Sequence, residues 1–340
     1  MSSNGYRDIL QTLIDRKDLT DEQAHGVFTE LMDGQLSEAQ IAGLLIALRT
    51  KGECVAEIAG AARAMREHAV KIDVGGADVI DIVGTGGTGL KTFNISTTSC
   101  FVAAGAGAKV AKHGNVTNTR ASGAADILSA LGVNLQATPE TVSRCIANAG
   151  VGFCFARACH PAMKYAAPVR KQLPVRTIFN VLGPLTNPAG ANRMILGAFA
   201  DEWTEPLAEV LGRLGVVHAW VVHAGDGLDE ITNTTTTRVS EIRNGKVRTW
   251  TMQPEDADLP RGALKDLLVT DPNESAAVAQ AVLDGKKGSP RNIVLLNVAA
   301  ALVVADLAKD LKDGVAKAEA SIDSGAAKAA LGRMVKESNA

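Results

Sequence analysis

One stretch, residues 79–97, constrains the fold of this chain more than any other. It opens with a short apolar run rich in β-branched residues, 79–83, which is typical of a buried parallel strand. A glycine-rich loop follows, and residues 94–97, Asn-Ile-Ser-Thr, then lead into a helical run of small residues over 98–108. Loop N–H groups can form a concave nest, and the dipole of the next helix adds partial positive charge. The stretch therefore predicts a phosphate-binding site.

The alternative interpretation is an ordinary glycine-rich turn, and glycine spacing alone does not decide between the two. The sequence matches neither the P-loop pattern nor the Rossmann dinucleotide pattern. Residues 92–97, Thr-Phe-Asn-Ile-Ser-Thr, favour the phosphate interpretation. They put hydroxyls and an amide where a sugar phosphate with a metal ion would need them.

The pattern before and after this stretch predicts two units. Residues 5–70 are helical throughout, with capping boxes at Thr20 and Ser37, and residues 73–78 form a hinge. From residue 79 strands alternate with helices, which indicates a mainly parallel sheet. The predicted strands are 79–83, 108–112, 151–156, 193–199 and 218–224. Asn244-Gly245 between alternating runs predicts an antiparallel hairpin at the end of the sheet.

Composition excludes several classes of function. A length of 340 residues allows one or two domains, and a net charge of −2 gives no argument for nucleic acid or an anionic membrane. The five cysteines are odd in number and scattered, which indicates buried thiols in a reducing compartment. Cys154, Cys159 and His160 do not have the spacing of a zinc site.

The ends and the most apolar segment favour a cytoplasmic protein. The N-terminus lacks the apolar region of a signal peptide. The run Ile293–Ala308 is interrupted by Asn297 and is too short to span a bilayer, so it should form a buried helix.

Further clusters follow the predicted strands, where ligands bind in open α/β sheets. Lys112-His-Gly-Asn115 could hold a phosphate through Lys112, and His113 could act as a base or orient a loop. Ser122-Gly123 is a second candidate phosphate loop, entering a helix at Ala124.

Two more clusters could bind a carboxylate and a cation. Arg170 could bind a carboxylate or simply be an exposed helix residue. Asp229 and Glu230, with Asp226, could bind Mg²⁺ or form a solvated acidic loop. No nucleophile stands in a triad-like pattern, so the combination favours a transfer in which the protein positions groups and stabilises charge.

Over nearly its whole length the chain resembles the anthranilate phosphoribosyltransferases of tryptophan biosynthesis. The motifs that carry the resemblance are Gly84-Thr-Gly-Gly87, Thr92-Phe-Asn-Ile-Ser-Thr97, Lys112-His-Gly-Asn115, Ser122-Gly-Ala-Ala-Asp126, His160-Pro-Ala-Met163, Arg176-Thr-Ile-Phe-Asn180, Gly183-Pro-Leu-Thr-Asn-Pro188 and Leu228-Asp-Glu230. Separated motifs in the same order are much more specific than any one of them.

The resemblance implies a reaction, a fold and an assembly. Anthranilate and phosphoribosyl pyrophosphate would give phosphoribosyl-anthranilate and pyrophosphate, with Mg²⁺ as the cofactor. A helical domain, residues 1–72, would join a larger α/β domain, residues 73–340, similar to pyrimidine nucleoside phosphorylases. A helix over residues 161–174 would pack with the N-terminal helices. The protein would be a homodimer joined through the helical domain, with no nucleic acid or membrane partner.

The resemblance also implies roles for individual residues. The residues expected at phosphoribosyl pyrophosphate are Gly84, Gly87, Thr88, Thr92, Asn94, Ile95, Ser96, Thr97, Lys112, Thr119, Arg120 and Ala124. Those expected at anthranilate are Gly84, His113, Asn115, Arg170 and Pro184, with Arg170 at the carboxylate. Ser96, Asp229 and Glu230 would meet magnesium, and Lys112 would stabilise charge. No general base is assigned.

The chain departs from the family pattern in two places. Thr88 stands where the family usually has Asp, and Val116 stands where it usually has Arg. Thr119 keeps a hydroxyl in this loop, and Arg120 is hypothesised to return the charge that Val116 removes.

Three alternatives to the anthranilate reaction remain at this point. They are a paralogue that uses another aromatic amine, a pyrimidine nucleoside phosphorylase, and a non-enzymatic, degenerate homologue that binds nucleic acid or a partner. The motif at 176–180 and the Asp229-Glu230 pair argue against a phosphorylase. A degenerate homologue should have lost the acidic pair or gained a basic groove, and the sequence shows neither.

Overall fold

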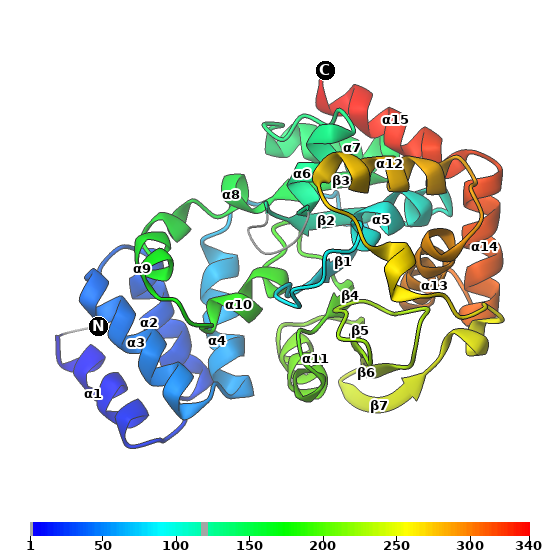
Figure 1. The fold of residues 1–340 in the computed structure, drawn as a ribbon. Coiled ribbons are helices and arrows are strands. Elements are labelled where there is room, and N and C mark those ends of the chain that lie inside the picture. Colours follow the sequence, from blue (N-terminus) through cyan, green and yellow to red (C-terminus); the bar gives the residue numbers. More distant parts are fainter. Residues whose placement is uncertain (1–2, 117–121) are drawn as a thin grey trace.

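The N-terminal part of the chain forms a helical unit (Figure 1). The computed structural model describes residues 3–116 and 122–340. The first helices are α1 (Ser3–Ile14), α2 (Asp21–Met32), α3 (Glu38–Lys51) and α4 (Val55–Glu67). Both predicted capping boxes are present, because Thr20 and Ser37 accept the N–H groups of Gln23 and Gln40. These caps fix where α2 and α3 begin.

A mixed sheet forms the centre of the larger unit. Within the described residues it has seven strands in the order β3-β2-β1-β4-β5-β6-β7. The strands are β1 (Ile80–Gly84), β2 (Val110–Gly114), β3 (Val151–Phe155), β4 (Arg193–Gly197), β5 (His218–Ala224), β6 (Thr237–Arg243) and β7 (Lys246–Met252). Strands β1 to β5 pair in parallel and β6 and β7 are antiparallel, so the predicted strands and hairpin are confirmed.

Helices cover both faces of this sheet. The helices that follow β1 in the chain are α5 (Ile95–Gly105), α6 (Ala124–Ala130), α7 (Pro139–Ala149), α8 (Ala156–Cys159), α9 (Ala167–Gln172), α10 (Phe179–Leu182), α11 (Thr204–Arg213), α12 (Pro272–Leu283), α13 (Ser289–Val304), α14 (Leu311–Asp323) and α15 (Ala326–Ser338); of these, α9 lies against the helical unit instead. The fold class predicted from the sequence, a small helical domain with a mainly parallel α/β domain, is confirmed.

Two helix predictions need correction. Helix α5 begins at Ile95 rather than Thr98, because the Asn94 side chain accepts the Thr97 N–H at 3.1 Å and caps it. The single helix expected over 161–174 is instead a 3₁₀ turn, Pro161–Lys164, followed by α9. Pro168 lies in the first turn of α9, since a proline inside a continuous helix would lose a hydrogen bond and clash with the preceding turn. Helix α9 contacts α3 of the helical unit.

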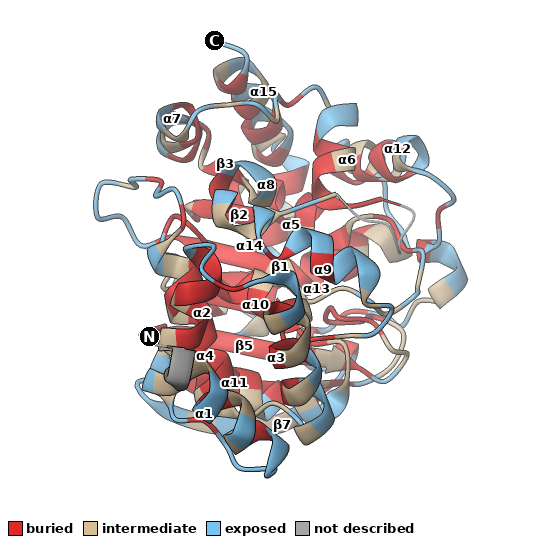
Figure 2. Cartoon of the chain, turned by 90° about the vertical axis from the view of Figure 1, so that its left-hand side faces the viewer, coloured by how far each residue is buried: buried red, intermediate tan, exposed pale blue. Residues whose placement is uncertain are grey.

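Two large apolar clusters hold the layers together. One joins α5 and the buried helix α13 to the sheet (Figure 2). The other is continuous from the N-terminal helices through α9 and α10 to α11 and strands β4 and β5. The helical unit therefore shares a core with one face of the sheet. Among residues 3–116 and 122–340, no helix has the length and hydropathy that crossing a bilayer requires.

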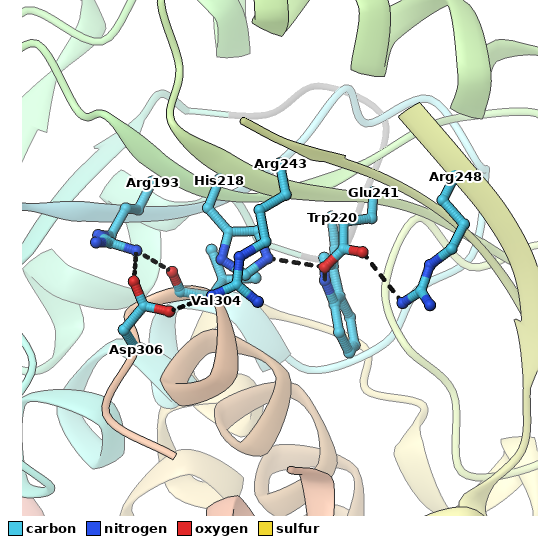
Figure 3. A network of polar contacts seen from close by, with 8 residues as sticks. All are labelled: Arg193, His218, Trp220, Glu241, Arg243, Arg248, Val304 and Asp306. Atoms are coloured by element: carbon cyan, nitrogen blue, oxygen red, sulfur yellow. Dashed lines mark hydrogen bonds and ion pairs between the residues drawn. The ribbon is translucent and has the colours of Figure 1, made fainter. Parts of the chain in front are cut away.

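A polar network fastens the amino ends of β4 and β5 (Figure 3). Asp306, after α13, pairs with Arg193 at 2.7 Å and Arg243 at 3.0 Å. Glu241 accepts hydrogen bonds from His218 at 2.9 Å and Trp220 at 3.0 Å. Burial works to raise the pKa of Glu241, but these two hydrogen bonds, together with the charges of His218 and Arg248, lower it overall. This network lies at the amino ends of the parallel strands, whereas the site described next lies at their carboxyl ends. We therefore interpret the network as structural.

Candidate active site

The site forms where the strand order reverses, between β1 and β4. Chain connections diverge at this point, which leaves a crevice outside the carboxyl ends of the strands. The glycine loop leaves β1 here and runs into α5. Gly86 and Gly87 have φ values of 68° and 79°, in the region that favours glycine. The Gly86 N–H donates to the Asp229 carboxylate at 2.9 Å, so the loop is bound to the acidic pair.

The acidic pair is buried, which contradicts the interpretation as a solvated loop. Asp229 is 2% exposed and Glu230 is 7% exposed. A Cβ atom on Gly84 would lie 2.3 Å from Asp229 Oδ2, and one on Gly197 would lie 1.7 Å from the Asp229 carbonyl oxygen. Glycine at the ends of both strands therefore allows Asp229 to enter the crevice. Burial raises the pKa of Cys100 on α5 to about 12, and the charges of Asp81 and Glu230 add to that shift.

The hydroxyl-rich residues lie at the start of α5, as expected. Ser96 is half-buried, whereas Thr92, Ile95 and Thr97 are buried. The Thr97 hydroxyl is fully buried and has no hydrogen-bond partner among the described residues. Thr88 is half-buried in the glycine loop. The structure thus brings these predicted residues to one loop and one helix start.

Lys112 is buried and bound to the backbone of β1. It is 3% exposed, and its Nζ donates to the Ile82 carbonyl at 2.5 Å, below the end of β1. Its role at phosphoribosyl pyrophosphate stays a prediction.

Sequence analysis missed a buried hydrogen-bond network that lies behind the crevice. Asp81, inside the run interpreted as apolar, accepts the His113 backbone N–H at 3.1 Å and the Asn187 amide at 2.8 Å. The Asn187 amide also donates to the Ala111 carbonyl at 2.8 Å. Burial raises the pKa of Asp81 to about 6, although Lys112 and these hydrogen bonds oppose that shift. The sequence did contain a signal for this network, namely a single carboxylate within an apolar strand.

A cavity of about 520 Å³ opens beside the crevice, between the helical unit and the sheet. Met65 of α4, Phe179 of α10 and Gly183 are part of its lining. Three residues predicted for anthranilate, His113, Asn115 and Arg170, line it as well. Of the other two, Gly84 lies at Asp229, and Pro184 is buried next to the lining residue Gly183.

Two histidines in the cavity wall are held neutral. The Nε2 atoms of His113 and His160 are 3.2 Å apart. Burial lowers the pKa of His113 well below its usual value, and that of His160 to about 4. Imidazoles with such low pKa values are weak bases at neutral pH. This favours the interpretation of His113 as a residue that orients the wall.

The cavity lining is cationic. Arg157, Lys164 and Arg170 line it together, and no Asp or Glu does so in the described part of the chain. The Arg170 guanidinium lies 5.1 Å from the centre of the Phe179 ring. Arg157 was missed by sequence analysis, although its place just after a predicted strand was a usable signal. Such a lining suits an anionic aromatic ligand.

Two predicted residues, Thr119 and Arg120, lie outside the described residues. Ala124, also predicted, is buried in the first turn of α6. The Ala125 N–H donates to the Asn115 carbonyl at 3.2 Å, so α6 is bound to the end of the β2 segment.

The chain matches known families over almost its whole length. Residues 7–69 match the family described as glycosyl transferase family, helical bundle domain, and residues 76–328 match glycosyl transferase family, a/b domain. An anthranilate phosphoribosyltransferase of Rhodospirillum rubrum is 51% identical over 334 residues, which cover 98% of this chain and 96% of the relative. The chain belongs to the anthranilate phosphoribosyltransferase family.

Solved structures of anthranilate phosphoribosyltransferases agree with this membership. The enzyme from Thermus thermophilus is 44% identical and has a TM-score of 0.92, covering 98% of this chain and 100% of its own. The enzyme from Saccharomyces cerevisiae in complex with phosphoribosyl pyrophosphate and Mg is 28% identical, with a TM-score of 0.90 and 99% coverage of both chains. The fold described above is therefore that of anthranilate phosphoribosyltransferases.

Proposed function

We propose that this protein transfers the phosphoribosyl group of phosphoribosyl pyrophosphate to the amine of anthranilate, releasing pyrophosphate, in tryptophan biosynthesis. The observation that carries the proposal is the buried Asp229 carboxylate, which is hydrogen-bonded to the glycine loop at the β1/β4 crevice. The cationic cavity lies beside this crevice, so a phosphorylated donor and an anionic acceptor would meet between them. The names of close relatives in the family support the same reaction.

The glycine loop and the start of α5 are the proposed donor site. The residues proposed to bind phosphoribosyl pyrophosphate are Gly84, Gly87, Thr88, Thr92, Asn94, Ile95, Ser96, Thr97, Lys112, Thr119, Arg120 and Ala124. Backbone N–H groups of the loop and the positive end of the α5 dipole attract phosphate oxygens. Lys112 would add charge from below the strand end as the leaving group becomes more negative.

The acidic pair fits magnesium in its chemistry. Mg²⁺ prefers oxygen donors and commonly takes one or two carboxylates together with substrate phosphates. We propose that Asp229, Glu230 and Ser96 hold it, as the yeast relative in complex with Mg supports. When bound, the ion would neutralise negative charge on the pyrophosphate group. Another acidic cluster, Asp18 with Cys54 and Glu57, is not a candidate, because Lys51 occupies it at 2.6 Å from Asp18.

The cavity is the proposed acceptor site. Arg170 would bind the carboxylate, and His113, Asn115, Pro184 and Gly84 would line the anthranilate path; Arg170, His113 and Asn115 lie in the cavity wall. The amine of anthranilate is neutral at pH 7, so its lone pair needs no strong base. The neutral His113–His160 pair is consistent with this, and no residue is assigned to take the proton.

Replacing Arg170 with alanine should mainly impair the use of anthranilate. A hydrogen bond to a charged group contributes about 2–3 kcal/mol, so kcat/KM for anthranilate should fall roughly 30-fold to 150-fold. Steady-state kinetics with either substrate varied measures this. Lys171→Ala is the matched control, because Lys171 is exposed and is not part of the cavity lining. A loss confined to phosphoribosyl pyrophosphate would contradict the assignment.

Removing the other two cations of the lining should slow the encounter with anthranilate. In the double variant Arg157→Gln, Lys164→Gln, kcat/KM for anthranilate should fall by about 3-fold to 10-fold at low salt, with kcat unchanged. The dependence of kcat/KM on ionic strength should also weaken. Lys246→Gln with Lys336→Gln removes the same charge from exposed positions outside the lining. Equal salt dependence in both double variants would argue against steering by the cavity.

An assay of pyrophosphate release separates this function from its alternatives. Release should require phosphoribosyl pyrophosphate, Mg²⁺ and anthranilate together. Another aromatic amine as the better acceptor would indicate a paralogue. Phosphate-dependent cleavage of a pyrimidine nucleoside would indicate a phosphorylase.

We further propose the domain division, assembly and location expected from the sequence. Residues 1–72 and the 161–174 segment would form the helical domain, and the remainder of 73–340 the α/β domain. The contact of α9 with α3 supports the first part. Homodimer formation through the helical domain is supported by the exposed apolar side chains of Ile14 on α1 and Ile46 on α3. The proposed location is the cytoplasm.

A further inference from the structure

The segment that carries Asp229 and Glu230 is bound by one side chain of the buried helix α13. Asn297 is 2% exposed and lies within an apolar part of this helix. Its Oδ1 accepts the Ile231 N–H at 3.1 Å, and its Nδ2 donates to the Ile231 carbonyl at 2.7 Å. Asn297 thus binds both backbone polar groups of the residue that directly follows Glu230.

The hydrogen bonds at Asn297 explain why asparagine stands there. Its Nδ2 has two hydrogens, and the second bond goes to the Ile293 carbonyl at 2.8 Å. One N–H group and two carbonyls therefore surround the amide, which fixes its orientation. An aspartate would turn an acceptor toward two carbonyls, and a leucine would leave all three groups without the amide partner.

A second amide binds the same segment to α13 from the other direction. Asn233 is fully buried, and its Nδ2 donates to both the carbonyl and the hydroxyl of Ser289, each at 3.1 Å. The segment 231–233 is therefore bound to α13 near the start of the helix and again at Asn297.

The acidic pair also has little freedom to move on the N-terminal side of Ile231. Asp229 lies between Gly84 and Gly197, where an added Cβ would overlap it. Asp226 closes the preceding turn, since its carboxylate accepts the Leu228 N–H at 3.2 Å and the Thr232 hydroxyl at 2.6 Å. If the backbone of Ile231 shifted, Glu230 and Asp229, which directly precede it, would consequently be displaced as well.

We propose that Asn297 is a positioning residue for the magnesium-binding carboxylates, with Asn233 as its second anchor. It acts through the Ile231 backbone and touches neither substrate. The proposal rests on the proposed function, because it presumes that Asp229 and Glu230 meet magnesium. Mutation of residues that orient metal ligands typically costs about 10-fold to 100-fold in metal affinity or activity.

The test measures binding without turnover. Calorimetric binding of phosphoribosyl pyrophosphate, with no acceptor present, is titrated with MgCl₂ for the wild type, Asn297→Asp, Asn297→Leu and Asn233→Ala. The Mg²⁺ concentration for half-maximal binding should rise by about 10-fold or more in the Asn297 variants. The KM for anthranilate at saturating Mg²⁺ should stay within about 2-fold of the wild type, since the cavity is not altered. Asn292→Ala, on the same helix, should behave as the wild type.

Each outcome bears on one claim. An unchanged magnesium requirement in folded Asn297 variants overturns the proposal. If neither Asn297 variant folds, Asn233→Ala decides in the same way, because it releases the same segment from α13. A parallel rise in the KM for anthranilate would show a general structural role and overturn it too. Failure of the proposed function is distinct, because the wild type itself would then bind no phosphoribosyl pyrophosphate in the presence of magnesium.

Discussion

Replacing Asp229 with asparagine and Glu230 with glutamine should abolish turnover. Both side chains are buried at the crevice, and the Gly86 N–H is bound to Asp229. Removal of both charges would lose the metal site, which supplies several kcal/mol of charge stabilisation, so kcat/KM should fall by about a thousand-fold or more. Pyrophosphate release at saturating Mg²⁺ measures the effect.

The chain offers a matched control for this pair. Asp201 and Glu202 are also adjacent, but they are exposed on the 3₁₀ turn before α11. Asp201→Asn with Glu202→Gln makes the same chemical change and should leave activity near that of the wild type. Near-normal activity in the Asp229 and Glu230 variant would show that the buried pair does not bind an essential metal.

Gly197→Ala should impair both folding and catalysis. The new Cβ would lie 1.7 Å from the Asp229 carbonyl oxygen, a backbone atom that cannot move away cheaply. Overpacking of this kind costs about 3 kcal/mol, which chemical denaturation measures as a lower free energy of unfolding. A misplacement of Asp229 by about 1 Å should also reduce kcat/KM for phosphoribosyl pyrophosphate by about 100-fold.

Gly332→Ala is the control for the glycine substitution. Gly332 lies in α15, and an added Cβ would meet no atom within 4 Å. This variant should be as stable as the wild type or slightly more stable, because alanine favours the helix. If Gly197→Ala had wild-type stability and an unchanged KM, the close approach of Asp229 would not matter for the site.

Features set by neighbouring residues could be predicted from the sequence. The capping boxes at Thr20 and Ser37 depend on residues three positions apart, and the structure contains both. The hairpin at Asn244-Gly245 depends on positive φ at two adjacent residues, 50° and 74° in the structure. Such signals are short-range, so one sequence is enough to find them.

Features that depend on distant contacts could not be predicted. Asp81 binds Asn187, 106 residues away, and nothing in the local pattern names that partner. The cavity takes Met65 from the helical unit and Phe179 from α10, which only the packing of the two units brings together. The role of Asn297 was equally hidden, because an interruption in an apolar helix does not show which backbone it binds.

The resemblance named the site residues but not their contacts. It assigned Lys112 to the donor, which stays a prediction, but it did not indicate that the Lys112 Nζ donates to the Ile82 carbonyl. It assigned Asp229 to magnesium, but the dependence of that position on Gly84 and Gly197 became visible only in three dimensions.

The most direct test of the proposed function follows the fluorescence of anthranilate in a mixture of the purified protein, phosphoribosyl pyrophosphate and Mg²⁺. We expect the fluorescence to fall as product forms, with an equal amount of pyrophosphate released, and to stay constant without magnesium. Constant fluorescence in the complete mixture, from a folded protein that binds phosphoribosyl pyrophosphate, would contradict the anthranilate assignment and point to a different acceptor.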